Sequence, residues 1–101
     1  MSRDIDLKEE SETKLDFDTP KMYKVILLND DYTVMDFVVE ILMKIFHKQY
    51  EEAVDIMITI HKAGKALCGV YPYDIAEAKV IQVKKLARKN GFPLRAIMEE
   101  E

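Results

Sequence analysis

The side chains best suited to bind a ligand come directly after a short apolar segment. Residues 25–28, Val-Ile-Leu-Leu, have the composition of a buried strand, and Asn29, Asp30 and Asp31 follow them. Carboxylate oxygens accept charge-assisted hydrogen bonds from an ammonium group, and an amide can both accept and donate. Three such side chains beside apolar surface predict a site for a positively charged partner.

The same residue types also have a purely structural use. Asp and Asn are common at turns and helix starts, where they bond backbone N–H groups, so residue type alone favours capping. Thr33 and Asp36 fit a capping box, with Thr33 as N-cap and Asp36 at N3. If Thr33 caps the helix, the three side chains before it are not all needed for capping, and a binding role stays open.

A further polar side chain lies on an apolar helix face. Ala53, Met57 and His61 are spaced four residues apart and Ile60 is three after Met57, so all four share one face. A single His in such a place is more often an edge or core residue than a ligand. Met at helical spacing is more often core. Neither residue by itself predicts a function.

Motifs of known enzymes are absent from the sequence, which has no Gly-rich phosphate loop, Cys-x-x-Cys or His-Glu-x-x-His. A metal site of His61, Asp30 and Asp31 would be a poor zinc set, because structural zinc favours Cys and His. A dyad of Cys68 with His61 is disfavoured because Cys68 lies in an apolar strand, where thiols are inert. We expect no enzyme activity, metal or cofactor.

Composition indicates one soluble domain. The chain has 101 residues, of which 49% are hydrophobic and 34% charged. No apolar run approaches the roughly 18 residues that span a bilayer, and the N-terminus lacks a signal-peptide core. The single cysteine has no partner for an internal disulfide. We therefore expect a cytoplasmic protein without a membrane partner.

The net charge of −4 lies entirely in residues 1–20, which hold three basic and seven acidic residues (3 − 7 = −4). Residues 21–101 hold twelve of each and sum to zero. No basic stripe is evident, so nucleic acid is not an expected partner. The polar, aperiodic start ends at Pro20. We expect residues 1–20 to form a flexible acidic arm and residues 21–101 the folded core.

Hydrophobic periodicity and turn residues predict six elements. Strands are expected at residues 22–29, 66–71 and 94–98, and helices at 33–46, 51–62 and 72–89. Gly64 should end the second helix in a left-handed conformation, Pro72 should be the first residue of the third, and the last three glutamates should fray. The order β-α-α-β-α-β predicts an α+β domain, with three helices packed on a small three-stranded antiparallel sheet.

Two segments resemble the signatures of the ClpS family, adaptors that deliver N-degron substrates to Clp AAA+ proteases. Residues 22–33, MYKVILLNDDYT, resemble the first signature, and residues 60–61, 64–66 and 68–70 resemble the second. The similarity covers residues 22 to about 98. It implies an adaptor that binds the free α-amino group and the bulky apolar first residue of its substrate.

The resemblance also implies roles for single residues. Asn29, Asp30 and His61 would bind the α-amino group. In ClpS proteins the adjoining cavity accepts Leu, Phe, Tyr and Trp, and a residue at the position of Met35 helps exclude β-branched side chains. The residues that would form or border this cavity are Asp31, Thr33, Met35, Val38, Met57, Ile60 and Leu94.

The implied protein partner is the N-terminal domain of a ClpA-like or ClpC-like unfoldase. Asp74, Glu77 and Lys79 are candidates for its docking surface, although a solvated helix face is the commoner use of such charges. Two positions depart from the family pattern. Val34 stands where Pro is usual, and Pro72 stands where a small polar residue is usual.

The same order of elements resembles a second class of protein, the C-terminal domain of the ribosomal stalk protein. That similarity would make the chain an interaction module without a small pocket. The Asn-Asp cluster with His61 distinguishes the two, because a flat docking surface does not require it. An enzyme with an Asp/His site is the third alternative.

Overall fold

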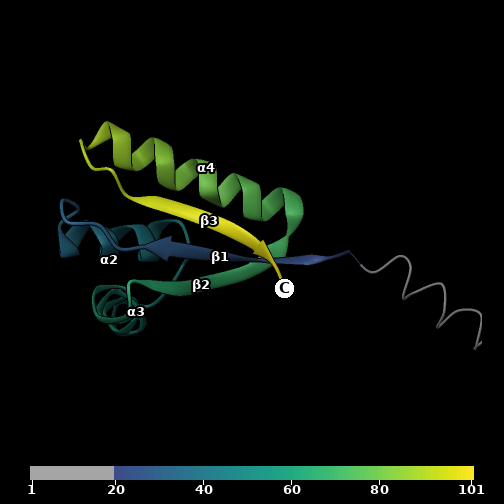
Figure 1. The fold of residues 1–101 in the computed structure, drawn as a ribbon, viewed down its shortest axis with the longest axis horizontal. Helices are drawn as coiled ribbons and strands as arrows, with labels where there is room; N and C mark the ends of the chain where they lie inside the picture. Colours follow the sequence, from purple (N-terminus) through teal and green to yellow (C-terminus); the bar gives the residue numbers. More distant parts are fainter. Residues whose placement is uncertain (1–19) are drawn as a thin grey trace, which may run out of the picture.

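The computed structural model describes residues 20–101, so the expected arm lies outside the described part except for Pro20 (Figure 1). The expected order of three strands and three helices is confirmed. None of the helices within residues 20–101 is long and apolar enough to cross a membrane. The elements are β1 (Met22–Leu28), α2 (Met35–Lys44), α3 (Tyr50–Ala63), β2 (Lys65–Pro72), α4 (Tyr73–Lys89) and β3 (Arg95–Glu100).

β1 is the central strand of an antiparallel sheet with the order β2-β1-β3. Val25 and Leu27 of β1 are fully buried, as expected for an apolar strand with neighbours on both edges. At the end of β1, Leu28 pairs with Lys65 on one side and with Arg95 on the other. The residues after Leu28 therefore emerge beside the ends of both neighbouring strands.

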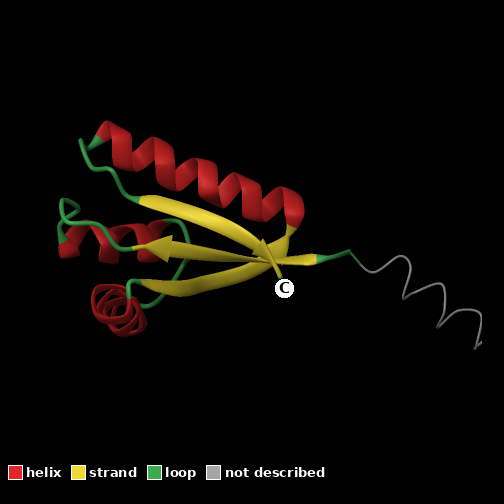
Figure 2. Cartoon of the chain, in the orientation of Figure 1, coloured by secondary structure: helices red, strands yellow, loops and turns green. Residues whose placement is uncertain are grey.

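The helices pack on the sheet in two groups (Figure 2). α4 runs alongside β3, whereas α2 and α3 lie near the end of β1, with α3 seen end-on in the same view. Fully buried side chains from the sheet and from α2 and α4 meet in one core, among them Leu27, Ile41, Leu42 and Val83. This packing fixes the start of α2 and the end of α3 beside the residues that follow β1.

β2 contains a bulge at Cys68. Val25 pairs with Gly69 while Ile26 pairs with Leu67, so Cys68 is an extra residue without a partner on β1. The bulge turns Cys68 into the core, where it is 0% exposed, and leaves Leu67 50% exposed. The expectation that Cys68 is buried in an apolar strand is confirmed.

The predicted capping box at the start of α2 is wrong. The helix begins at Met35 with Val34 as its N-cap, and no side chain caps it. The hydroxyl of Thr33 instead donates to Asp30, so Thr33 belongs to the preceding turn. The Val34 backbone has φ −71° and ψ 149°, an extended conformation close to the φ that a proline would fix.

Gly64 ends α3 as expected, with φ 91° and its N–H donating to the Ile60 carbonyl at 2.9 Å. Pro72 differs from the prediction, because it is the last residue of β2 and the N-cap of α4 rather than the first helical residue. A proline at this edge-strand position has the φ of −58° that both roles tolerate.

The acidic C-terminus is also more ordered than predicted. Glu99 and Glu100 belong to β3, and the N–H of Glu101 donates to the Met22 carbonyl at 2.9 Å. Lys21 forms an ion pair with Glu100 at 3.3 Å. Pairing with the start of β1 satisfies the backbone groups of these residues, and this outweighs their poor strand propensity.

Candidate functional site: a cavity at the end of β1

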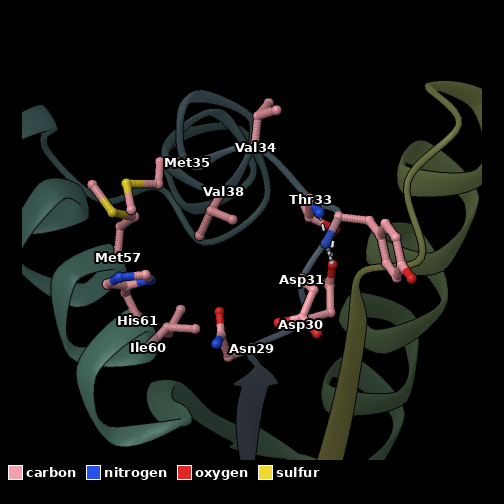
Figure 3. Close-up of a pocket in the computed structure, with 11 residues that line it drawn as sticks. Asn29, Asp30, Asp31, Thr33, Val34, Met35, Val38, Met57, Ile60 and His61 are labelled. Atoms are coloured by element: carbon pink, nitrogen blue, oxygen red, sulfur yellow. Dashed lines mark hydrogen bonds between the residues drawn. The ribbon is translucent and has the colours of Figure 1, made fainter.

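A cavity of about 420 Å³ opens between the end of β1, the start of α2 and the last turns of α3 (Figure 3). Such a volume lies within the range of small-ligand sites. Nine of the ten cavity and amine-site residues expected from the resemblance line it. The full lining is Asn29, Asp30, Asp31, Tyr32, Thr33, Val34, Met35, Val38, Met57, Ile60 and His61.

Asn29 and His61 face the cavity from different elements. The amide of Asn29 points into it from the end of β1, while His61 projects from the last turn of α3 (Figure 3). Both side chains are exposed, as is that of Asp31. The N–H of Asn29 donates to the Gly64 carbonyl at 2.9 Å, which ties the end of β1 to the end of α3. This bond fixes the backbone segments that carry the two polar side chains relative to each other.

Asp30 organises the turn that follows β1. Its Oδ1 accepts the N–H groups of Tyr32 at 2.8 Å and Thr33 at 2.7 Å, and its Oδ2 accepts the Thr33 hydroxyl at 2.8 Å. The capping use of Asp is therefore realised at Asp30, at a turn rather than at a helix start. A carboxylate offers about four lone-pair sites, so three bonds leave room for one more donor.

These hydrogen bonds keep Asp30 ionised. Partial burial alone would raise the pKa of its carboxyl, but the bonds from Thr33 and Tyr32 outweigh burial and hold the pKa below the ordinary value of 3.8. Because the folded pKa is lowered, the stabilisation is present above the ordinary value and is lost as the pH falls through the folded value. At neutral pH the turn therefore presents a negative charge at the cavity edge.

The interior wall of the cavity is apolar. Val38 of α2 and Ile60 of α3 are 6% and 3% exposed and lie deepest. Met35 and Met57 project from the two facing helices on the side of the cavity nearest α3 (Figure 3). Met35 is 47% exposed, which places it at the mouth. The cavity thus combines a polar, anionic edge with an apolar interior.

The cavity also holds two residues that sequence reasoning did not assign to it. Tyr32 and Val34 line the cavity although their side chains are 77% and 53% exposed. Their position could have indicated them, because both are large apolar residues between a predicted ligand site and a helix. Apolar side chains that stay exposed at such a place often belong to a binding surface.

Leu94 is the expected cavity residue that the structure places elsewhere. It is 1% exposed, belongs to the hydrophobic core and is not among the cavity residues. Leu94 precedes β3 and lies under a different hollow, beside Val80 and Ala96. Its side chain packs in the core. The cavity is lined by residues of α2, α3 and the turn after β1.

The candidate docking residues lie near the opposite end of the sheet. Asp74 accepts the N–H of Ile75 at 3.0 Å and Glu77 accepts the Tyr73 hydroxyl at 3.3 Å, and both acids are exposed. α4 starts where β2 ends, opposite Met22 of β1. The seven residues of β1 separate this end from the cavity by about 23 Å.

The side chain of Lys79 has its partners within the fold. Its Nζ donates to the Ile45 carbonyl at 2.6 Å and lies 5.6 Å from the centroid of the Tyr71 ring. The side chain thereby links α4 to the end of α2 and to β2. Asp74 and Glu77 are the more accessible of the three docking candidates.

Comparison with known proteins identifies the family. A family model described as ATP-dependent Clp protease adaptor protein ClpS matches residues 18–97. The chain belongs to the ClpS family. It is therefore an adaptor of the Clp protease system, and the stalk-like alternative is not favoured.

Two curated ClpS adaptors illustrate the similarity. The protein of Wolinella succinogenes is 52% identical over 100 residues, which cover 99% of this chain and 98% of the relative. The protein of Acetivibrio thermocellus is 59% identical over 90 residues, covering 89% and 91%. Both are named adaptors rather than enzymes, in agreement with the lack of catalytic motifs.

A solved structure in the family carries a ligand. Agrobacterium tumefaciens ClpS2 bound to L-phenylalaninamide has a TM-score of 0.79 and 41% sequence identity, and the match covers 81% of this chain and 99% of that one. The fold predicted from the sequence is thus the ClpS fold. As to metals, no three His, Cys, Asp or Glu side chains within residues 20–101 are grouped closely enough to hold an ion.

Proposed function

We propose that this ClpS protein binds the N-terminal residue of substrate proteins and passes them to a Clp AAA+ unfoldase. The α-ammonium would lie at the polar edge formed by Asn29, Asp30 and His61, and a Leu, Phe, Tyr or Trp side chain would fill the apolar interior. One observation carries the proposal: an ionised carboxylate stands at the mouth of a cavity whose floor is Val38 and Ile60.

The chemistry of a free N-terminus matches both halves of the cavity. An α-ammonium has three N–H donors, and Asn29, Asp30 and the His61 imidazole each offer an acceptor. Burial of a Leu or Phe side chain contributes about 1.5–3 kcal/mol, and a hydrogen bond to a charged group adds about as much. Because the cost of association is subtracted from these gains, such a small footprint gives weak, readily reversible binding. The ligand of the Agrobacterium relative, a free amine with an aromatic side chain, has the same two features.

The proposal is tested with short fluorescent peptides that differ only in their first residue. We expect Leu-, Phe-, Tyr- and Trp-first peptides to bind in a polarisation titration, and an Asp-first peptide to bind at least tenfold more weakly, because it brings a carboxylate beside Asp30 and Asp31. Equal affinity for Leu-first and Asp-first peptides would show that the cavity does not read the first side chain.

Met35 is expected to select the shape of that side chain. It lies at the cavity mouth beside Met57, and replacement by Ala removes the bulk that excludes branching at Cβ. Met35→Ala should therefore admit Ile-first and Val-first peptides and narrow their gap to Leu by at least about fivefold, because specificity is a difference of affinities. Met43→Ala, at a 40% exposed α2 position outside the cavity, is the control. An unchanged gap in Met35→Ala would mean that Met35 only packs.

Delivery is expected to depend on the acidic arm. An arm of roughly 20 flexible residues would reach about 25 Å, enough to engage an unfoldase while the cavity holds cargo. Deletion of residues 1–17 should leave peptide affinity and melting temperature nearly unchanged, and should slow degradation of an N-degron substrate by the cognate Clp protease sharply. Undiminished degradation would make the arm dispensable, and lost peptide binding would assign it to the fold.

The unfoldase partner that we propose is the N-terminal domain of a ClpA-like or ClpC-like protein, docked near Asp74 and Glu77. Both acids are exposed near the end of the sheet where the described chain begins at Pro20. The arm would therefore leave the domain beside the docked partner and far from the cavity. A cytoplasmic location fits the free thiol of Cys68.

A further inference from the structure

Three cationic side chains gather at a hollow close to the cavity. Lys84 and Arg88 are one turn apart on α4, and Arg95 is the first residue of β3. With Val80, Leu94 and Ala96 they line a hollow of about 250 Å³. Among residues 20–101, none of the three cations forms an ion pair. We call Lys84, Arg88 and Arg95 the cationic row.

The row reflects a segregation of charge that the total for residues 21–101 conceals. Residues 78–98 contain six basic and no acidic residues, namely Lys79, Lys84, Lys85, Arg88, Lys89 and Arg95. Cations are favoured in the last turn of a helix by its dipole, which accounts for Arg88 and Lys89. It does not account for Arg95, which belongs to a strand, or for Lys84, which lies more than a turn before the helix end.

The cationic row is continuous with the candidate site. Arg95 also lines a second hollow, of about 280 Å³, together with Asn29, Asp30 and Tyr32, all of which line the cavity. Its backbone pairs with Leu28, the residue before Asn29. A chain that leaves the polar edge of the cavity on this side therefore meets Arg95 first, then Arg88 and Lys84.

We infer that the substrate residues that follow the first one run along the cationic row, and that carboxylate side chains there strengthen binding. The inference rests on the proposed function, because it places the substrate N-terminus at Asn29 and Asp30. An extended chain advances about 3.3 Å per residue, and we place its third to fifth residues along the row. Arg fits carboxylates well, since its planar fork donates two parallel hydrogen bonds.

The test uses Leu-first peptides that carry three Glu or three Gln residues at positions three to five, titrated by polarisation. In 50 mM NaCl we expect the Glu peptide to bind about five- to tenfold more tightly, because exposed ion pairs contribute modestly and three act together. In 500 mM NaCl the difference should nearly vanish through screening.

Two double variants locate the effect. Lys84→Gln with Arg88→Gln should remove most of the Glu preference. The amine site should be undisturbed by these changes, since neither residue lines a hollow that contains Asn29. Lys62→Gln with Lys65→Gln removes the same charge from exposed positions near the other side of the cavity and should keep the preference. A full-length chain and one lacking residues 1–17 should show the same preference.

The outcomes separate this inference from the proposed function. Equal binding of the Glu and Gln peptides, or equal loss in both double variants, would overturn the cationic row as a substrate path. A Glu preference that appears only after removal of residues 1–17 would assign the row to the acidic arm instead. Failure of the Gln peptide to bind at all would overturn the proposed function.

Discussion

N-acetylation of a Phe-first peptide is expected to lower its affinity for this protein at least tenfold. Acetylation removes the positive charge and two N–H donors, so the bonds to Asn29, Asp30 and His61 lose their partner, while the Phe side chain still fits the cavity. Polarisation titrations of the free and acetylated peptides measure the difference. Equal affinities for the free and acetylated peptides would show that the protein does not recognise the amine.

Asp30→Asn provides the matching change in the protein. Asp30→Ala would also remove the three hydrogen bonds that hold the turn, whereas Asn keeps an oxygen for the N–H groups of Tyr32 and Thr33. The Asn variant should bind the free peptide about tenfold more weakly and bind the acetylated peptide like the parent. Asp55→Asn, an exposed change on α3 outside the cavity, is the control. If both variants lose affinity equally, only general charge is involved.

The thiol of Cys68 is expected to react about a thousandfold more slowly in the folded protein than in the unfolded chain. Burial raises its pKa from 9.0 to about 12, and the Leu27 backbone and Lys48 oppose this only weakly. Since the thiolate is the nucleophile, its fraction at pH 8 falls by the same factor. Alkylation with iodoacetamide, with and without denaturant, measures the ratio.

The same pKa sets a direction for stability. Because the folded pKa is raised, the fold keeps its stability below pH 9 and loses part of it as the pH rises from 9.0 towards 12. Cys68→Ser would not serve as a control, since it buries a hydroxyl group, but Cys68→Ala removes the titration with little polar cost. Rapid labelling of the folded protein would place the thiol at the surface and contradict the bulge geometry.

The elements with strong local signals could be predicted from the sequence. Three of these signals depend only on residues that are close in the sequence, and each was confirmed. They are the apolar run of β1, the left-handed Gly64, and the helical spacing of Met57 and His61. The start of α2 could not be predicted, because the Thr33 hydroxyl can either cap the helix or donate to Asp30. Side-chain geometry decides between these two bonds. Glu100 was misjudged because its order comes from distant pairing with β1.

The site shows the same division. Asn29, Asp30 and His61 meet because β1 and α3 end at one place, and the family resemblance, rather than the order of elements, grouped them in advance. Leu94, which only the family resemblance assigned to the cavity border, lies in the core instead, because packing between distant elements sets its place. The cationic row was missed because its members lie on two elements, and a total of charges over eighty residues does not reveal their clustering.

The placement of β1 has a mechanical consequence. The described chain begins at Pro20, directly before a strand bonded along both edges, and the cavity lies at the far end of that strand. A pull on the N-terminus along the strand axis loads the hydrogen bonds to β2 and β3 in shear, so they resist together instead of opening one by one. An unfoldase that pulled on the N-terminus would have to break both sets of hydrogen bonds together. The cavity at the other end of β1 would keep its bound cargo until these bonds broke.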